Sequence, residues 1–116
     1  MARHAAASHE WEGLSIDELT DAAWQSLHAS VAEVHAPAGI RHPLARSTRS
    51  EAYYYCVNGS VAFEVEGRRD VLHAGDLLIV ELNEWYRYEA LEESALVAFS
   101  APAYDPASYE FRADDQ

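Results

Sequence analysis

The sequence predicts a single all-β domain, an antiparallel sandwich or barrel. Its 116 residues are enough for one domain with a sizeable core and too few for two. From Trp24 onward the chain consists of short runs rich in β-forming residues. Turn residues such as the Asn58-Gly59 pair separate these runs, at the spacing typical of antiparallel hairpins.

Taken in order, the elements begin with a segment, residues 1–10, that is small and polar and is expected to be mobile. Ser15 and Glu18 form a capping-box pattern that predicts a short helix over residues 15–23, placed to cover one end of the barrel. Six β-rich runs follow, at residues 27–36, 52–57, 60–66, 77–82, 85–91 and 95–101. Residues 112–116 read as a mobile acidic tail, so the domain is expected to span residues 11–111.

Charge and composition exclude several classes of partner. The chain carries 20 acidic and 8 basic residues, a formal net charge of -12, and such a surface repels nucleic acid and anionic lipid. Its one cysteine excludes an internal disulfide and agrees with a reducing compartment. No run is apolar enough for a membrane span, so a cytoplasmic protein is expected.

Two stretches carry a family resemblance. The spacing of the second conserved motif of the small cupin barrels falls without a gap on Gly75, Glu81, Asn83, Tyr86 and Ala90. That of the first falls, with one extra residue before its last glycine, on Gly39, Ala45, Ser47, Glu51 and Gly59. The chain therefore resembles a small single-domain cupin, which implies a double-stranded β-helix, or jelly-roll barrel.

The same resemblance implies that this chain lacks the usual metal site. Ala45, Ser47 and Tyr86 stand at three of the four positions where cupins keep their metal ligands. We therefore expect neither a metal nor another cofactor.

A narrower resemblance comes from "CVNGSV" at residues 56–61, "YDPASY" at residues 104–109, and Trp85 before Tyr86. The cupins that act as dTDP-4-keto-6-deoxyhexose 3,4-ketoisomerases have similar segments. Their paired catalytic histidines are replaced here by Ala45 and Ser47.

Strand alternation offers two inward-facing sets around the first motif. If Ala45 faces the cavity, Ser47, Arg49, Glu51, Tyr53 and Tyr55 face it too. The other frame contains Arg46, Thr48, Ala52, Tyr54 and Cys56. We prefer the first frame because it agrees with the motif and brings a carboxylate beside two phenols, and the same parity points Tyr86 and Tyr88 inward.

These residues form the candidate site. Desolvation among aromatic rings would make Glu51 a general base, and Tyr53 and Tyr86 could donate a proton or hold an oxyanion. The alternative for Glu51 is a solvent-facing carboxylate at a strand edge, and the alternative for Tyr86 is a tyrosine that fills the space of the lost histidine. The expected substrate-binding residues are Ser47, Arg49, Tyr55, Tyr88, His42 and Glu81.

The sequence favours a metal-independent isomerase, cyclase or dehydratase acting on a small oxygenated metabolite. Alternatives are a sugar-nucleotide ketoisomerase with displaced catalytic groups, and a cupin that only binds a small ligand. A homodimer is expected, through an outer face containing Trp85, Tyr54 and Cys56.

Overall fold

The computed structural model describes residue 3 and residues 5–20 and 28–112. Within them the chain forms strands and one 3-10 turn, at Pro106–Ser108. The strands are β1 (Ala7–Trp11), β2 (Leu14–Glu18), β3 (Ser30–Ala36), β4 (Arg41–Ser47), β5 (Glu51–Asn58), β6 (Ser60–Val65), β7 (Arg68–His73), β8 (Leu77–Val80), β9 (Tyr86–Ala90), β10 (Ser94–Ala101) and β11 (Tyr109–Arg112). The predicted all-β class is confirmed.

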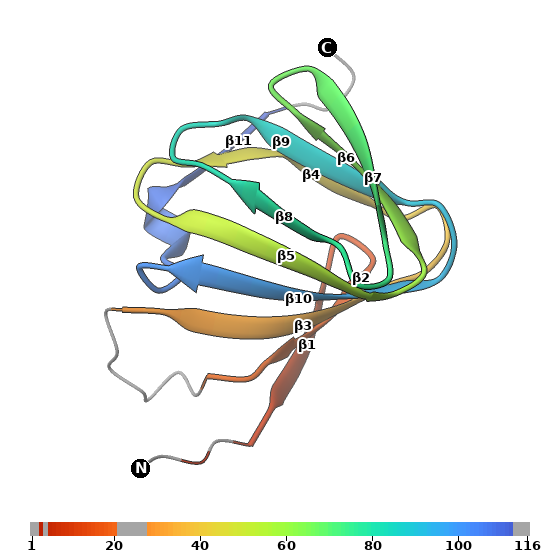
Figure 1. The fold of residues 1–116 in the computed structure, drawn as a ribbon. Coiled ribbons are helices and arrows are strands. Elements are labelled where there is room, and N and C mark those ends of the chain that lie inside the picture. The colour runs from red at the N-terminus through yellow and green to blue at the C-terminus, as the bar shows by residue number, and fades with distance from the viewer. Residues whose placement is uncertain (1–2, 4, 21–27, 113–116) are drawn as a thin grey trace.

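The strands form two sheets that face each other and curve into a jelly-roll barrel (Figure 1). The six-stranded sheet has the order β1-β2-β3-β10-β5-β8, and the five-stranded sheet has the order β11-β4-β9-β6-β7. All paired neighbours are antiparallel. Among the described residues no helix is long and apolar enough to cross a bilayer.

The helix expected at residues 15–23 is wrong where the structure describes it. Residues 14–18 form β2, which pairs with β1 on one side and β3 on the other, and residues 21–23 lie outside the described residues. Leu14 is buried and Ile16 packs against the core, a spacing of two that suits a strand. β1 also begins within the segment expected to be mobile, at Ala7, and β11 extends to Arg112.

The Asn58-Gly59 pair separates two strands as expected, but it does not form a hairpin, because β5 and β6 lie in different sheets. Gly59 has φ +84, in the left-handed region that glycine tolerates best. A Cβ atom there would overlap the Ser94 side chain and the Glu93 carbonyl oxygen. Any side chain at this position would therefore push β6 away from the β9–β10 connection.

The connection between β4 and β5 changes which residues face the interior. Ala45 and Ser47 are buried on β4, whereas Ala52, Tyr54 and Cys56 are the buried positions of β5. Residues 48–50 turn the chain from one sheet to the other, and the Ser47 hydroxyl accepts the N–H groups of residues 49 and 50. Because alternation does not continue through this turn, the inward frame expected for residues 49–55 is wrong.

Candidate functional site

The barrel encloses a cavity of about 200 Å³ that opens to solvent. This is several times the roughly 30 Å³ that one water molecule takes up in the liquid, so the space suits a small organic ligand. Its inner end, which we call the floor, is formed by His42 of β4, Tyr54 of β5, and Tyr86 and Tyr88 of β9. Strands from both ends of the chain form the mouth.

His42 reaches the floor because β4 is irregular. The β4–β9 pairing shifts register between His42 and Ala45, so both side chains are buried although three positions separate them. Pro43 lies within the irregularity, where a residue without an N–H is tolerated in a strand. The imidazole packs against Tyr86 and Tyr88, with ring centroids 5.3 and 4.7 Å away.

One hydrogen bond fixes the tautomer of His42. Its Nδ1 lies 2.7 Å from the carbonyl oxygen of Pro43. A carbonyl oxygen only accepts, so Nδ1 carries the hydrogen, and in the neutral ring Nε2 carries the lone pair. The Nδ1–H is thus engaged with the backbone of β4, and Nε2 is the acceptor atom of the neutral ring.

The floor also contains a pair of tyrosine hydroxyls. The oxygen atoms of Tyr54 and Tyr86 lie 2.9 Å apart, and either can be the donor. The pair has two protons and uses one for this bond, which leaves the second able to donate to another group. Tyr88 lies beside them, with its ring centroid 5.6 Å from that of Tyr54.

Burial keeps these phenols neutral. Desolvation is the main cause that raises the pKa of Tyr54, Tyr86 and Tyr88, and the neighbouring phenols add to it. At physiological pH the floor therefore offers O–H donors and no phenolate. Such donors suit an oxygen on which negative charge develops during a reaction.

Four aromatic side chains surround the mouth, and we call them the aromatic wall: Trp11, Tyr104, Tyr109 and Phe111. The Trp11 and Phe111 ring centroids are 5.7 Å apart, and those of Tyr104 and Tyr109 are 4.9 Å apart. Burial raises the pKa of the Tyr109 phenol, and the neighbouring Ser100 and Ser47 side chains partly oppose that shift. The wall therefore joins β1 to the segment that follows β10.

Glu18 is the acidic side chain among the described residues around the cavity, and His9 lies beside it. Of the residues described around the cavity, only Glu18, His9 and His42 are ionisable apart from the tyrosines. The Glu18 carboxylate lies 3.3 Å from the His9 ring nitrogen. Burial raises the pKa of Tyr104, and the charges of Tyr109, Glu18 and Asp105 raise it further.

Three predicted site residues meet at the floor: His42, Tyr86 and Tyr88. Tyr54, which belonged to the frame we did not prefer, joins them. It could have been found only by treating residues 48–50 as a turn that resets the alternation. The aromatic wall was not predicted, because nothing in the local sequence shows that Trp11 and Phe111 meet.

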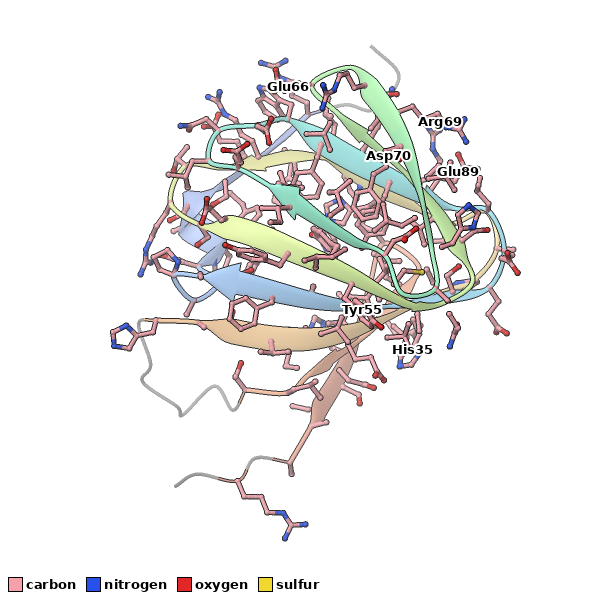
Figure 2. The ribbon with its side chains drawn as sticks, viewed as in Figure 1. His35, Tyr55, Glu66, Arg69, Asp70 and Glu89 are labelled. Atoms are coloured by element: carbon pink, nitrogen blue, oxygen red, sulfur yellow. The ribbon has the colours of Figure 1, made fainter. Side chains whose placement is uncertain are left out.

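Three other predicted residues lie on the outer side of β5. Tyr53 donates to the Glu51 carboxylate at 3.2 Å, and this carboxylate raises the pKa of the Tyr53 phenol. Tyr55 is exposed on the outer side of the six-stranded sheet (Figure 2). Glu51, Tyr53 and Tyr55 are thus absent from the described cavity lining, contrary to the expected frame.

The remaining predicted residues have structural partners away from the cavity. Arg49 forms an ion pair with Asp105 at 3.1 Å. Ser47 is buried and organises the turn after β4. Glu81 is exposed, and its N–H donates to the Glu84 carboxylate.

Trp85 lies outside the cavity and fastens β11. The guanidinium carbons of Arg46 and Arg112 lie 4.9 and 4.0 Å from the centre of its ring. Arg46 also forms an ion pair with Glu110 at 3.1 Å. These cation–π contacts connect β4, the residue before β9, and the strand that carries Tyr109 and Phe111.

The cavity residues do not fit a metal centre. The positions of the usual cupin ligands hold Ala45, Ser47 and Tyr86, and the floor offers a single imidazole among phenols. Within the described residues, the one group spaced to hold an ion is Asp17, Glu33 and His35. These side chains already pair with one another on β2 and β3, outside the cavity.

Comparison with known proteins identifies the family. The cupin domain family matches residues 32–102, more than half of the chain. No curated protein sequence matches it significantly.

Solved structures show the same fold. Pac13, described as a unique nucleoside dehydratase, superposes with a TM-score of 0.86 at 18% identity, covering 100% of this chain and 94% of Pac13. A histidine-to-glutamine variant of Streptomyces PAC13 with uridine gives 0.83 at 20% identity, covering 96% and 88%. KdgF from Halomonas sp. superposes with a TM-score of 0.76 at 20% identity, covering 90% of this chain and 91% of KdgF.

Proposed function

This chain belongs to the cupin family, and we propose that it is a metal-independent dehydratase that eliminates water from a small, uncharged, nucleoside-like metabolite. The observation that carries the proposal is the floor of the cavity. There a histidine of fixed tautomer stacks against two neutral tyrosines, Tyr86 and Tyr88, and the Tyr86 hydroxyl is paired with that of Tyr54, in a space that opens to solvent. We assign the proton transfer to His42 in place of Glu51, because Glu51 lies on the outer side of β5.

His42 is suited to act first as the base. Nε2 would remove a proton from a carbon next to a carbonyl group, where the C–H bond is most acidic. The Nδ1–H bond to Pro43 stabilises the imidazolium that results, since the donating N–H becomes more acidic as the ring gains charge. Catalytic histidines often donate their other ring N–H to a carbonyl or carboxylate oxygen, which stabilises the imidazolium in the same way.

The tyrosines stabilise the charge that the reaction creates. As the C–H bond breaks, its electrons move toward the carbonyl oxygen, which can accept the spare proton of the Tyr54–Tyr86 pair as a hydrogen bond. The electrons then form the C=C bond while the C–O bond at the next carbon breaks. The imidazolium of His42 gives its proton to the departing hydroxide, so water leaves and the histidine returns to its neutral form.

The comparison with Pac13 supports this reaction class. Pac13 is named a nucleoside dehydratase, and structures with uridine exist for its histidine-to-glutamine variant and for two tyrosine-to-phenylalanine variants. The floor of this chain holds the same residue types, a histidine and tyrosines. At 18–20% identity the likeness of the folds alone would not support the assignment, and the composition of the floor is what adds weight.

The charge of the cavity argues against the sugar-nucleotide ketoisomerase. A diphosphate needs cationic or N–H-rich partners. Around the cavity the described residues include no arginine, and Arg49 forms its ion pair with Asp105. A diphosphate near the mouth would also be repelled by the Glu18 carboxylate.

The test is a screen of carbonyl-bearing nucleosides and sugars, with loss of water detected by mass spectrometry. A substrate of the native protein should be turned over by His42→Gln about 10²- to 10⁴-fold more slowly. His35→Gln is the matched control, because this imidazole lies on the outside of the barrel (Figure 2), and it should react like the native protein. Activity should also survive a chelator.

Two outcomes would overturn the proposal. Normal turnover by His42→Gln would show that another group moves the proton. Binding of a nucleoside without turnover across the screen would instead favour a cupin that only binds its ligand.

A further inference from the structure

We infer that the aromatic wall at the mouth is a recognition site for an uncharged planar ring carried by the substrate. The inference rests on the proposed function and deepens it, because it assigns the part of the ligand that takes no part in the chemistry. Under it, the specificity-determining residues are Tyr104 and Phe111.

The first argument is the exposure of the wall. Tyr104 and Phe111 are 48% and 47% exposed, although both border the cavity. Aromatic side chains at this exposure leave a large apolar area in contact with water, which binding of a flat apolar surface would remove. Tyr109, more buried, holds its ring at 25° to that of Phe111 with centroids 6.4 Å apart, so the two rings present one nearly continuous surface.

The second argument is the polarity of the cavity along its length. At the floor the groups that can contact a ligand are the His42 imidazole and the tyrosine hydroxyls, which suit the oxygens of a sugar. At the mouth the described groups are the four rings of the aromatic wall, with Glu18 and His9 beside them. A ligand that satisfies both ends has an oxygenated part and a flat part, and the arrangement orients it with the flat part outward.

The third argument concerns charge. Glu18 borders the mouth, and its charge is one of those that raise the pKa of Tyr104. A negatively charged ring would be repelled there, whereas a neutral ring with N–H donors would find an acceptor in this carboxylate. The chemical class is therefore a heterocycle that carries N–H donors and no negative charge, joined to a sugar.

The experiment compares two probes, uridine and methyl β-D-ribofuranoside, which lacks the planar ring. Titration calorimetry on the full chain should show tighter binding of uridine. Tyr104→Leu and Phe111→Leu should each weaken uridine binding about 5- to 20-fold and change riboside binding less than about twofold.

Two variants control for general effects. Phe99→Leu makes the same change on the outer side of β10, away from the cavity, and should bind uridine like the native protein. Phe111→Trp keeps a ring in the wall and should retain uridine binding, which a loss of folding would not allow.

Unchanged uridine affinity in both leucine variants would overturn the inference. An equal loss of affinity for uridine and for the riboside would also overturn it, because the substitutions would then disturb the whole cavity and not contact with the planar ring. Failure of the native protein to bind uridine would overturn it as well. In each case water elimination by the native protein, lost in His42→Gln, would still decide the proposed function separately.

Discussion

The hydroxyl pair of Tyr54 and Tyr86 permits a quantitative test of the floor. Each of Tyr54→Phe and Tyr86→Phe keeps the ring packing and removes one oxygen from the 2.9 Å contact. The hydroxyl that remains loses its partner inside the barrel. The double variant removes both oxygens together, so no hydroxyl is left unpaired.

The expected magnitudes follow from this geometry. A buried polar group without its partner costs about 1–3 kcal/mol. Both hydroxyls border a cavity that water can enter, so each single variant should lower the free energy of unfolding by about 1 kcal/mol, the lower end of that range. The double variant should cost less than the sum of the singles, with a coupling of about 0.5–1 kcal/mol.

Urea denaturation of the four proteins, followed by far-ultraviolet circular dichroism, measures these differences. The comparison requires equal denaturant slopes, which show that the same surface is exposed in each case. If the double variant costs as much as the two singles added together, the hydroxyls are not coupled and the hydrogen bond described here does not stabilise the protein.

Three further measurements test other parts of the reasoning. Burial raises the pKa of the Tyr54, Tyr86 and Tyr88 phenols above the ordinary value of 10.0. Their contribution to stability is therefore complete below about pH 10 and is lost as the pH rises through the folded-state pKa. The melting temperature should fall above about pH 10, and it should fall less steeply in the Tyr54→Phe, Tyr86→Phe double variant. Uridine should bind at least about tenfold more tightly than uridine diphosphate, because the described cavity lining contains no arginine or lysine to pair with the phosphates. Equal affinities in calorimetry would contradict the proposed uncharged substrate. The homodimer stays a prediction, and we expect its interface on the exposed apolar outer side of β5 and β8. Ile79→Glu should therefore give a monomer in light scattering. A monomeric native protein would refute the prediction.

That interface replaces the one expected from the sequence. Tyr54 and Cys56 were expected on the outside, but both are buried within the barrel. Trp85 does lie outside the cavity, where Arg46 and Arg112 cover its ring. The exposed apolar side chains of the six-stranded sheet include Tyr55, which lies opposite Leu77 on β8.

The fold could be predicted because its signals are local. Gly59 ends β5 with a positive φ, as its type favours, and Tyr86 and Tyr88 alternate inward within one uninterrupted strand. The Asn58-Gly59 pair does not form the hairpin that it suggests, because it connects two sheets. The N-terminal helix was wrongly predicted because the capping pattern of Ser15 and Glu18 is also local, and pairing of β2 with strands on both sides prevailed.

The site could be predicted only in part, because it depends on irregular backbone. His42 belongs to the floor through a register shift that strict alternation would not allow. Tyr54 replaces Tyr53 and Tyr55 because residues 48–50 turn between sheets and reset the parity. The wall depends on Trp11 and Phe111, whose meeting is a property of the whole topology.

The position of β11 at the edge of the five-stranded sheet has a consequence for synthesis in the cell. The floor residues lie on β4, β5 and β9, whereas Tyr109 and Phe111 are translated later, on β11, which pairs with β4. A nascent chain that has left the ribosome only as far as β10 would therefore contain the floor residues without Tyr109 and Phe111 of the aromatic wall. Under the proposed function, we expect that a protease that removes β11 would weaken substrate binding while the floor residues remain in place.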